Sequence, residues 1–282
     1  MIDSTRGVLA IFAHPDDETF STGGTLALVA RDGGRARVVC ATNGDEGGEG
    51  ADGDHSMDPE IRRSELRAAC AALGIEPPVF LGYRDSGMEG WGAKPGSLAL
   101  ADPEEATGRL AEEIRRFRPS VVITFDPGGI YGHPDHVAIS GLASEAFRRA
   151  AAEPGGPVAL YHVAIQRSFI PEMGRLMAAA ATAAGEAGGE PAREPTADDL
   201  AQRTKFVELA RPDEDFTTHV DVRPVIARKI AAMAAHASQT GEMGVDNGPP
   251  GTVDRMLGDE WFIRVVPEPS PRSPLESMVG PI

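Results

Sequence analysis

Residues 8–12 read VLAIF, an unbroken apolar run without the polar alternation of a half-exposed strand. A strand that is buried on both faces has this composition, and such strands occur mainly in parallel sheets. Similar segments recur at residues 37–42 and 121–125. Helical periodicity lies between them, at residues 25–31, 60–73 and 103–117. This alternation predicts an α/β fold, with a Rossmann-like, mostly parallel sheet and helices on both faces.

The rest of the chain continues the pattern less regularly. Further strands are predicted at residues 79–81, 158–165, 217–222 and 261–266, and further helices at 173–184, 225–237 and from the 126–136 loop to about 149. We expect a single domain over residues 1–282, with its core at about 7–240 and an insertion at about 170–215. Within the insertion, residues 185–195 are predicted to be a surface linker. A loose tail is expected from about residue 267.

Composition and charge limit the classes of function. The chain has 282 residues, of which 41% are hydrophobic, enough for one large folded domain. Its formal net charge is −16, so nucleic acid and anionic membranes are not expected as partners. No apolar run reaches the length of a signal peptide or a membrane span, so we expect a cytoplasmic enzyme without membrane insertion. Cys40 and Cys70 fit small buried side chains better than a disulfide.

Three chemically rich segments follow predicted strands. AHPDDE at residues 13–18 follows the first strand, TNGDEG at 42–47 follows the second, and YGHPDH at 131–136 lies beyond the strand at 121–125. Ligands of open parallel sheets bind outside the carboxyl ends of the strands. We therefore expect one crevice to hold all three segments, although they are far apart in the sequence.

The first segment contains residue types that bind a zinc-like divalent ion. His14 and Asp17 are three residues apart, so a turn that enters a helix can direct both side chains to one point. Asp16 then points elsewhere and is free for another role. The alternative is a helix start enriched in acids that suit the helix dipole. That alternative accounts for Glu18, which we interpret in this way, but it accounts poorly for His14.

The third segment offers the remaining ligand. His133 and His136 are also three residues apart, with Asp135 between them, and one of the two histidines can complete a set of three protein ligands. Three ligands leave a coordination position open for water, as catalytic zinc sites require. The chain has seven histidines, and three of them stand in these two motifs. This clustering favours a metal site over isolated surface histidines.

The second segment does not have the spacing of a dinucleotide-binding loop. Its glycines do not follow the G-x-G-x-x-G pattern. Asp45, Glu46 and Glu49 would also repel a pyrophosphate. We interpret this loop as a wall of the crevice.

Taken together, the motifs AHPDDE and GHPDH resemble those of the PIG-L/LmbE-like de-N-acetylases. This family includes the deacetylases of N-acetylglucosaminyl-phosphatidylinositol, mycothiol and bacillithiol biosynthesis. Further similar segments are the loop at 42–47, the R-x-x-E-L helix at 62–66, LGYRDSGM at 81–88 and residues 229–239. The resemblance spans roughly residues 7–240, and it implies an LmbE-like deacetylase fold.

The resemblance implies roles for the residues of the first and third segments. His14, Asp17 and His136 match the family's metal ligands, which implies one Zn²⁺ per chain, with Fe²⁺ or another divalent ion as alternatives. Asp16 matches the general base. His133 matches the residue that stabilises the oxyanion or donates a proton.

Four further residues match family positions. Asp135 would orient a histidine, and Tyr131 matches a mobile tyrosine at the carbonyl group of the substrate. Arg62 and Asp85 match positions that contact the substrate. His236 lies in a segment that also resembles the family, and we favour a structural role for it.

The implied reaction is removal of the acetyl group from a small N-acetylglucosamine-type amino sugar. The metal lowers the pKa of a bound water, Asp16 takes a proton from this water, and the water attacks the amide carbonyl. The metal, His133 and Tyr131 would stabilise the oxyanion.

Several alternatives remain at this stage. An amidase of thiol conjugates, such as a mycothiol-type conjugate, breaks the same kind of bond, and the insertion is expected to shape that choice. A metallophosphoesterase would need more bridging carboxylates and more basic residues for phosphate. A non-catalytic sugar- or nucleotide-binding module would not need the five residues His14, Asp16, Asp17, His133 and His136 together. The sequence does not decide the acyl substrate, the native metal or whether the chain forms a homo-oligomer.

Overall fold

The structure is a computed structural model that describes residues 7–48, 55–186, 197–240, 251–267 and 275. One seven-stranded sheet runs through it, in the order β3-β2-β1-β4-β5-β7-β6. The strands are β1 (Val8–Phe12), β2 (Ala36–Thr42), β3 (Val79–Tyr83), β4 (Val121–Phe125), β5 (Ala159–Val163), β6 (Thr218–Asp221) and β7 (Asp259–Val266). β1 to β5 are parallel to one another, and β7 is antiparallel to both of its neighbours, β5 and β6. The predicted mostly parallel α/β sheet is confirmed.

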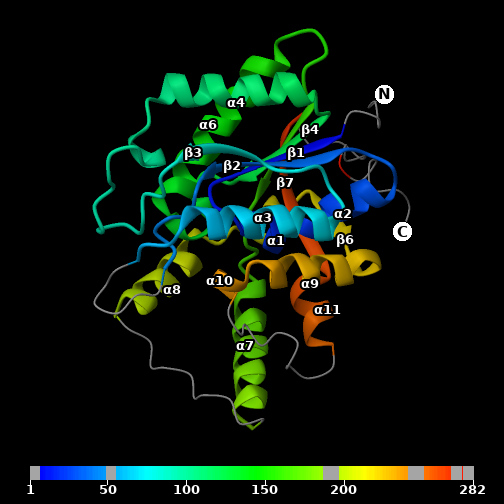
Figure 1. Cartoon of the computed structure of the whole chain (residues 1–282). Coiled ribbons are helices and arrows are strands. Elements are labelled where there is room, and N and C mark those ends of the chain that lie inside the picture. Colours follow the sequence, from blue (N-terminus) through cyan, green and yellow to red (C-terminus); the bar gives the residue numbers. More distant parts are fainter. Residues whose placement is uncertain (1–6, 49–54, 187–196, 241–250, 268–274, 276–282) are drawn as a thin grey trace.

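Helices cover both faces of the sheet (Figure 1). On one side lie α2 (Gly23–Arg31), α3 (Pro59–Leu73) and, packed against both, α9 (Ile226–Ala235). On the other side α4 (Pro103–Phe117) packs on α6 (Pro134–Ala151), which contacts β1 and β4. The remaining helices are α1 (Asp17–Ser21), α5 (Gly129–Gly132), α7 (Phe169–Glu186), α8 (Ala197–Leu209), α10 (Ala237–Thr240) and α11 (Thr252–Leu257).

The topology brings the ends of β1 and β4 together. The chain passes from β1 outward through β2 and β3, then returns to place β4 on the opposite side of β1. Val8 pairs with Val121 and Ala10 with Ile123, so these two five-residue strands end at the same level. The order of strands reverses here, and ligands of open α/β sheets bind at such a point.

Several helix ends follow the signals in the sequence. Asp58 caps α3 by accepting a hydrogen bond from the backbone N–H of Glu60, and Pro59 begins the helix. Gly74 ends α3 with a φ of 77°, in the left-handed region that glycine adopts without strain. The expectation for the cysteines is also confirmed, because both are free and buried.

The structure corrects the description of the third motif as a loop. Residues 129–132 form α5, and Pro134 begins α6, so Asp135 and His136 lie in the first turn of a helix. The side chain of His133 caps that helix by accepting the backbone N–H of Asp135. Pro134 suits the first helical position because its missing N–H would have no partner there.

The predicted insertion contains a helix that the sequence did not indicate. Helix α8 follows α7, and its residues contact α5. Gln166 pairs with Arg211, so the chain leaves the sheet and returns to it at adjacent positions. Most of the predicted linker at 185–195, and nearly all of the predicted tail, lies outside the described residues.

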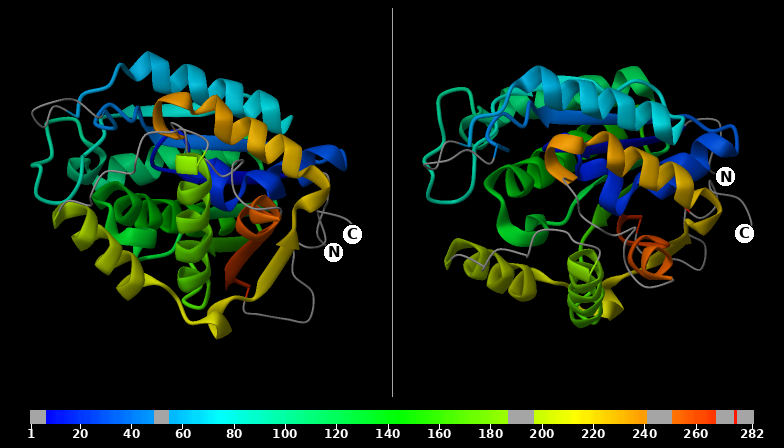
Figure 2. Two further views of the ribbon diagram at one scale, coloured as in Figure 1. Left: turned by 90° about the horizontal axis from the view of Figure 1, so that it is seen from below. Right: turned by 60° about the horizontal axis from the view of Figure 1, so that its bottom comes forward.

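Strand β7 lies between β5 and β6, so the sheet extends beyond residue 240, where the predicted core ends. Figure 2 shows β7, in orange to red, beside the yellow strand β6. Among the described residues, no helix is long and apolar enough to span a membrane.

Candidate metal centre and active site

The residues of the first and third motifs meet just beyond the ends of β1 and β4. His14 lies two residues after β1, and Asp17 begins α1. His136 lies in the first turn of α6, where its ring stacks on Phe125 at the end of β4, with centroids 4.1 Å apart. These elements bring together side chains that are separated by about 120 positions in the sequence.

Potential ligand atoms of three residues converge at this place: one ring nitrogen each of His14 and His136, and both carboxylate oxygens of Asp17. The Nδ1 atom of His14 lies 3.1 Å from the Nε2 atom of His136 and 3.6 Å from Oδ2 of Asp17, and Oδ1 of Asp17 lies 3.3 Å from the same Nε2. An ion about 2.0–2.2 Å from each of three tetrahedral ligands would hold them about 3.3–3.6 Å apart. The spacing and the N₂O donor set therefore fit a zinc-like divalent ion.

Each ligand is oriented by a second contact. The other ring nitrogen of His14, Nε2, lies 3.2 Å from Oδ2 of Asp135, and Nδ1 of His136 lies 3.3 Å from the carbonyl oxygen of Gly129. Asp17 accepts the backbone N–H of His14 through Oδ2 at 2.7 Å. Such partners fix the tautomer of a ligating histidine and increase its basicity. The carboxylate of Asp135 thus faces the distant His14, not the histidines beside it in the sequence.

Two other groups of potential ligands share His14. Ligand atoms of His14, His133 and His136 lie within 4.8 Å of one another, as do those of His14, Asp85 and Asp135. We favour the set with Asp17 because His133, Asp85 and Asp135 already accept hydrogen bonds from other protein groups. His133 accepts a backbone N–H through Nδ1 at 3.1 Å, so its neutral ring carries a proton on Nε2.

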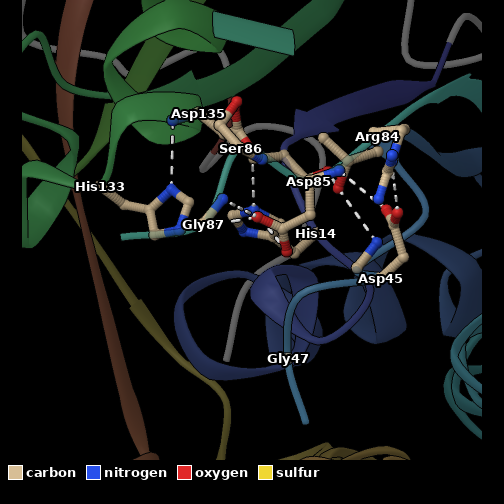
Figure 3. Close-up of polar contacts among 12 residues, drawn as sticks. His14, Asp45, Gly47, Arg84, Asp85, Ser86, Gly87, His133 and Asp135 are labelled. Atoms are coloured by element: carbon tan, nitrogen blue, oxygen red, sulfur yellow. Dashed lines mark hydrogen bonds and ion pairs between the residues drawn. The ribbon is translucent and has the colours of Figure 1, made fainter. Parts of the chain in front are cut away.

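The second group includes two carboxylates that already accept protein hydrogen bonds. Asp135 accepts both the N–H, at 2.8 Å, and the hydroxyl of Ser86, and Asp85 accepts the N–H of Gly87 at 2.8 Å (Figure 3). Oδ2 of Asp85 also lies 3.5 Å from Nε2 of His14. The carboxylates of Asp85 and Asp135 therefore both lie beside Nε2 of His14, and Nδ1 is the nitrogen that lies near His136.

The electrostatics of the site favour a cation. Burial lowers the pKa of His14, but the carboxylates of Asp85, Asp135 and Asp17 outweigh this effect and raise it well above the usual value. Burial raises the pKa of Asp17, but His136 and His14 outweigh it and hold the pKa at about 2. A fixed negative charge stands beside two buried imidazoles, which suits a bound positive ion.

Asp16 points away from the ligand set. Its side chain is 20% exposed, against 10% for Asp17, and its Oδ2 accepts from Nη2 of Arg62 at 3.2 Å. Burial raises the pKa of Asp16 to about 6, although Arg62 opposes this shift. A carboxylate beside a metal site with a pKa near neutrality can accept a proton during catalysis.

Asp16 also has an unusual backbone. Its φ of 119° and ψ of −29° lie in a region that L-amino acids rarely adopt. Strain of this kind persists only where the surrounding contacts enforce it, and it clusters at functional sites.

Arg62 joins this turn to the loop after β2. Its buried guanidinium donates to the carbonyl oxygen of Pro15 at 2.6 Å and of Gly44 at 3.3 Å, as well as to Asp16. These contacts position the general-base candidate. The predicted contact of Arg62 with substrate stays a prediction, as does that of Asp85.

His133 faces the site as a neutral donor. Burial, together with the nearby His14 and His136, lowers its pKa to about 3. Its Nε2 lies 3.9 Å from Oδ1 of Asp85. A neutral imidazole that carries its proton on Nε2 can donate a hydrogen bond to an oxygen that gains negative charge.

Tyr131 lies on α5 against the same histidines. Its ring packs edge-on against those of His136 and His133, with centroids 5.0 and 6.1 Å away. Burial, with Asp17 and Asp16 nearby, raises the pKa of Tyr131 well above its usual value. Its hydroxyl therefore keeps its proton and can donate a hydrogen bond.

The structure places all nine predicted site residues at this edge of the sheet, and it adds Ser86 and a contact between Glu18 and His236 that the sequence reasoning did not predict. Ser86 was in a quoted motif but received no role. Glu18, interpreted as a helix-start acid, is fully buried and contacts His236, which lies 218 positions later and is also fully buried. Glu18 also accepts the backbone N–H of Asp16, two residues away, and only this local contact could have been predicted from the sequence.

Comparisons with known proteins cover the part of the chain that forms this candidate site. The family model for PIG-L, described as GlcNAc-PI de-N-acetylase, matches residues 9–147, a range that includes all nine predicted site residues. A 1D-myo-inositol 2-acetamido-2-deoxy-alpha-D-glucopyranoside deacetylase from Acidothermus cellulolyticus is 39% identical over 278 residues, which cover 91% of this chain and 86% of that relative.

Solved structures show the same fold. The N,N'-diacetylchitobiose deacetylase from Pyrococcus horikoshii has a TM-score of 0.58 at 20% identity, covering 95% of this chain and 91% of that chain. The 4-carboxy-2-hydroxymuconate hydratase GalB from Pseudomonas putida has a TM-score of 0.57 at 22% identity, covering 95% and 99%. Since these two proteins have different activities, their likeness shows the fold alone.

Proposed function

The chain belongs to the PIG-L family and is a de-N-acetylase, and from this premise we propose that it uses one zinc ion to deacetylate an N-acetylglucosamine joined to inositol. The observation that carries the proposal is the convergence of His14, Asp17 and His136 with Asp16 beside them. The substrate class rests on the name of the relative at 39% identity.

His14, Asp17 and His136 would hold the ion. When bound, a divalent ion supplies a Lewis acid and lowers the pKa of water toward neutrality. The two imidazoles and one carboxylate are a donor set that suits zinc, and ferrous iron is the main alternative. We assign one ion to each chain.

Side chains of the protein would transfer the protons and stabilise the negative charge that develops on the carbonyl oxygen of the substrate. We assign to Asp16 the removal of a proton from the attacking water, because its carboxylate is oriented by Arg62 and has a pKa near neutrality. His133 and Tyr131 would donate hydrogen bonds to the carbonyl oxygen as it becomes negatively charged. The leaving amine would then take the proton that Asp16 removed from the water, which completes the hydrolysis to acetate and free amine.

The remaining expectations belong to the same proposal. We propose a cytoplasmic, single-domain enzyme with a small-molecule amino-sugar substrate, and the insertion at about 170–215 as the part of the chain that shapes substrate choice. The contact between α8 and α5, the helix that carries Tyr131, supports that role for the insertion. The oligomeric state is left open.

Acetate release tests the proposal. The purified chain is supplied with GlcNAc-inositol, N-acetylglucosamine and N,N'-diacetylchitobiose, with zinc, with a chelator, and with zinc restored after chelation. We expect most acetate from GlcNAc-inositol, loss of acetate with chelator, and recovery with zinc. If metal-loaded protein releases no acetate from any of the three, the proposed N-acetylglucosamine-type substrate is refuted. Cleavage of a thiol-conjugate amide instead would favour the amidase alternative.

A further inference from the structure

Glu18 connects the general-base candidate to a distant helix. Its Oε2 accepts the backbone N–H of Asp16 at 3.1 Å, and its Oε1 lies 2.8 Å from Nε2 of His236, the residue that ends α9. Both side chains are fully buried. One oxygen of this carboxylate therefore contacts the backbone of Asp16, and the other contacts the ring of His236.

The contact with Asp16 is made at its strained backbone. On the other side of that residue, the carbonyl oxygen of Asp16 accepts both the N–H of Thr19, at 3.0 Å, and its hydroxyl, at 2.8 Å. The side chain of Asp16 is held by Arg62. Glu18 supplies the hydrogen bond to the N–H, so a relaxation of the peptide toward a common conformation would leave a buried carboxylate oxygen without this donor.

This backbone conformation separates two adjacent carboxylates. Asp17 faces His14 and His136, whereas Asp16 faces Arg62 and is the more exposed of the two. A rotation at Asp16 would move its carboxylate away from the place where a base must act. Small displacements of a reacting group cost a large part of the rate.

We propose that Glu18 and His236 form a positioning pair that holds Asp16 in the orientation required for proton transfer. This inference rests on the general-base role in the proposed function. Glu18 touches neither substrate nor metal in this assignment. It acts through the backbone of Asp16, and His236 acts by fixing Glu18.

A purely structural role is the competing explanation, and the same helix offers a matched control. Lys229 on α9 lies 2.8 Å from Glu260 on β7, and both side chains are almost fully buried. Glu260 also accepts the N–H groups of Gly24 and Thr25 at the start of α2. This second buried pair also anchors α9, but it does not contact Asp16.

The experiment compares Glu18→Met, Glu18→Gln and Glu260→Gln in metal-loaded enzyme. Methionine fills the space of glutamate without accepting a hydrogen bond, whereas glutamine can accept the N–H of Asp16 and donate to His236. For Glu18→Met we expect kcat to fall about tenfold to a hundredfold, with KM and metal content unchanged. Glu18→Gln should restore most of kcat. Glu260→Gln should lower the melting temperature without changing kcat.

The outcomes separate the positioning role from its alternatives. Wild-type kcat in folded, metal-loaded Glu18→Met overturns the positioning role, and so does a loss of kcat that Glu260→Gln reproduces. If Glu18→Met does not fold, His236→Leu removes the other half of the pair and must lower kcat without raising KM. A wild-type chain that releases no acetate refutes the proposed function itself, which is a different result.

Discussion

The adjacent residues Asp16 and Asp17 allow one closely matched pair of substitutions. Asp16→Asn and Asp17→Asn remove one charge each, from neighbouring positions, without changing side-chain size. Asp17 contacts His14 and His136, whereas Asp16 contacts Arg62, so the two variants should fail in different ways. We expect Asp17→Asn to lose metal. Asp16→Asn should keep its metal and lose turnover.

The size of the Asp16 effect follows from its role and its surroundings. A positioned general base contributes about 10²–10⁴ in rate, which corresponds to about 2.7–5.5 kcal/mol of activation free energy. The stability cost should be small, about 0–1 kcal/mol, because the pair with Arg62 is partly exposed. Arg62 also keeps its bonds to two backbone carbonyls. A large loss of kcat with nearly unchanged unfolding free energy is therefore expected.

The assay combines three measurements on each variant: bound metal by elemental analysis, kcat and KM by acetate release, and unfolding free energy by urea titration. If Asp16→Asn with full metal retains more than about a third of the wild-type kcat, the general-base assignment is wrong. If Asp17→Asn binds metal as tightly as the wild-type chain, the ligand assignment is wrong.

Three further predictions address protonation, ligand orientation and stability. Because burial raises the pKa of Asp16 to about 6, and the base must be deprotonated, kcat should fall about tenfold per pH unit below this pKa. A bound cation favours the charged form of Asp16, so the apparent pKa should lie at or below 6. This pKa is measured from kcat between about pH 4.5 and pH 8. Activity that rises on acidification would contradict the prediction. Asp135→Asn would place an amide donor among the N–H and hydroxyl donors of Ser86 and Nε2 of His14, so metal affinity should fall about 10–100-fold in a chelator competition, and unchanged affinity would remove its orienting role. Lys229→Met leaves Glu260 buried without its ion pair and should cost about 3–5 kcal/mol in urea unfolding. A second change, Glu260→Gln, should recover part of this loss, whereas additive losses would show that the two groups act independently.

Local sequence predicted the elements of the sheet well. The apolar runs at 8–12 and 121–125 form β1 and β4 with the predicted bounds, and the helix at 103–117 also has the predicted bounds. These segments carry their own signals, because continuous apolar composition and proline at a helix start act within a few residues. The same local rules did not reveal α8, whose amphipathic pattern is weak and whose contacts lie with α5.

The candidate ligands could also be proposed from sequence, but their partners could not. The spacing of His14 and Asp17 directs both to one point, and His136 lies within 3.1–3.3 Å of them. Nothing in the third motif indicates that Asp135 faces His14 and not its own neighbours. That contact exists because the first turn of α6 is set against the end of β1.

By itself, the sequence determined the buried strands and the family to which the chain belongs, because these depend on residue types at short spacing. Tertiary structure alone decided where Glu18 points. A carboxylate in the first turn of a helix usually faces water, where it avoids the free-energy cost of desolvation. Here α9 covers α1 and provides His236, so the same residue is fully buried and holds the backbone of Asp16. Only the packing of elements more than 200 residues apart places a second polar group beside that carboxylate.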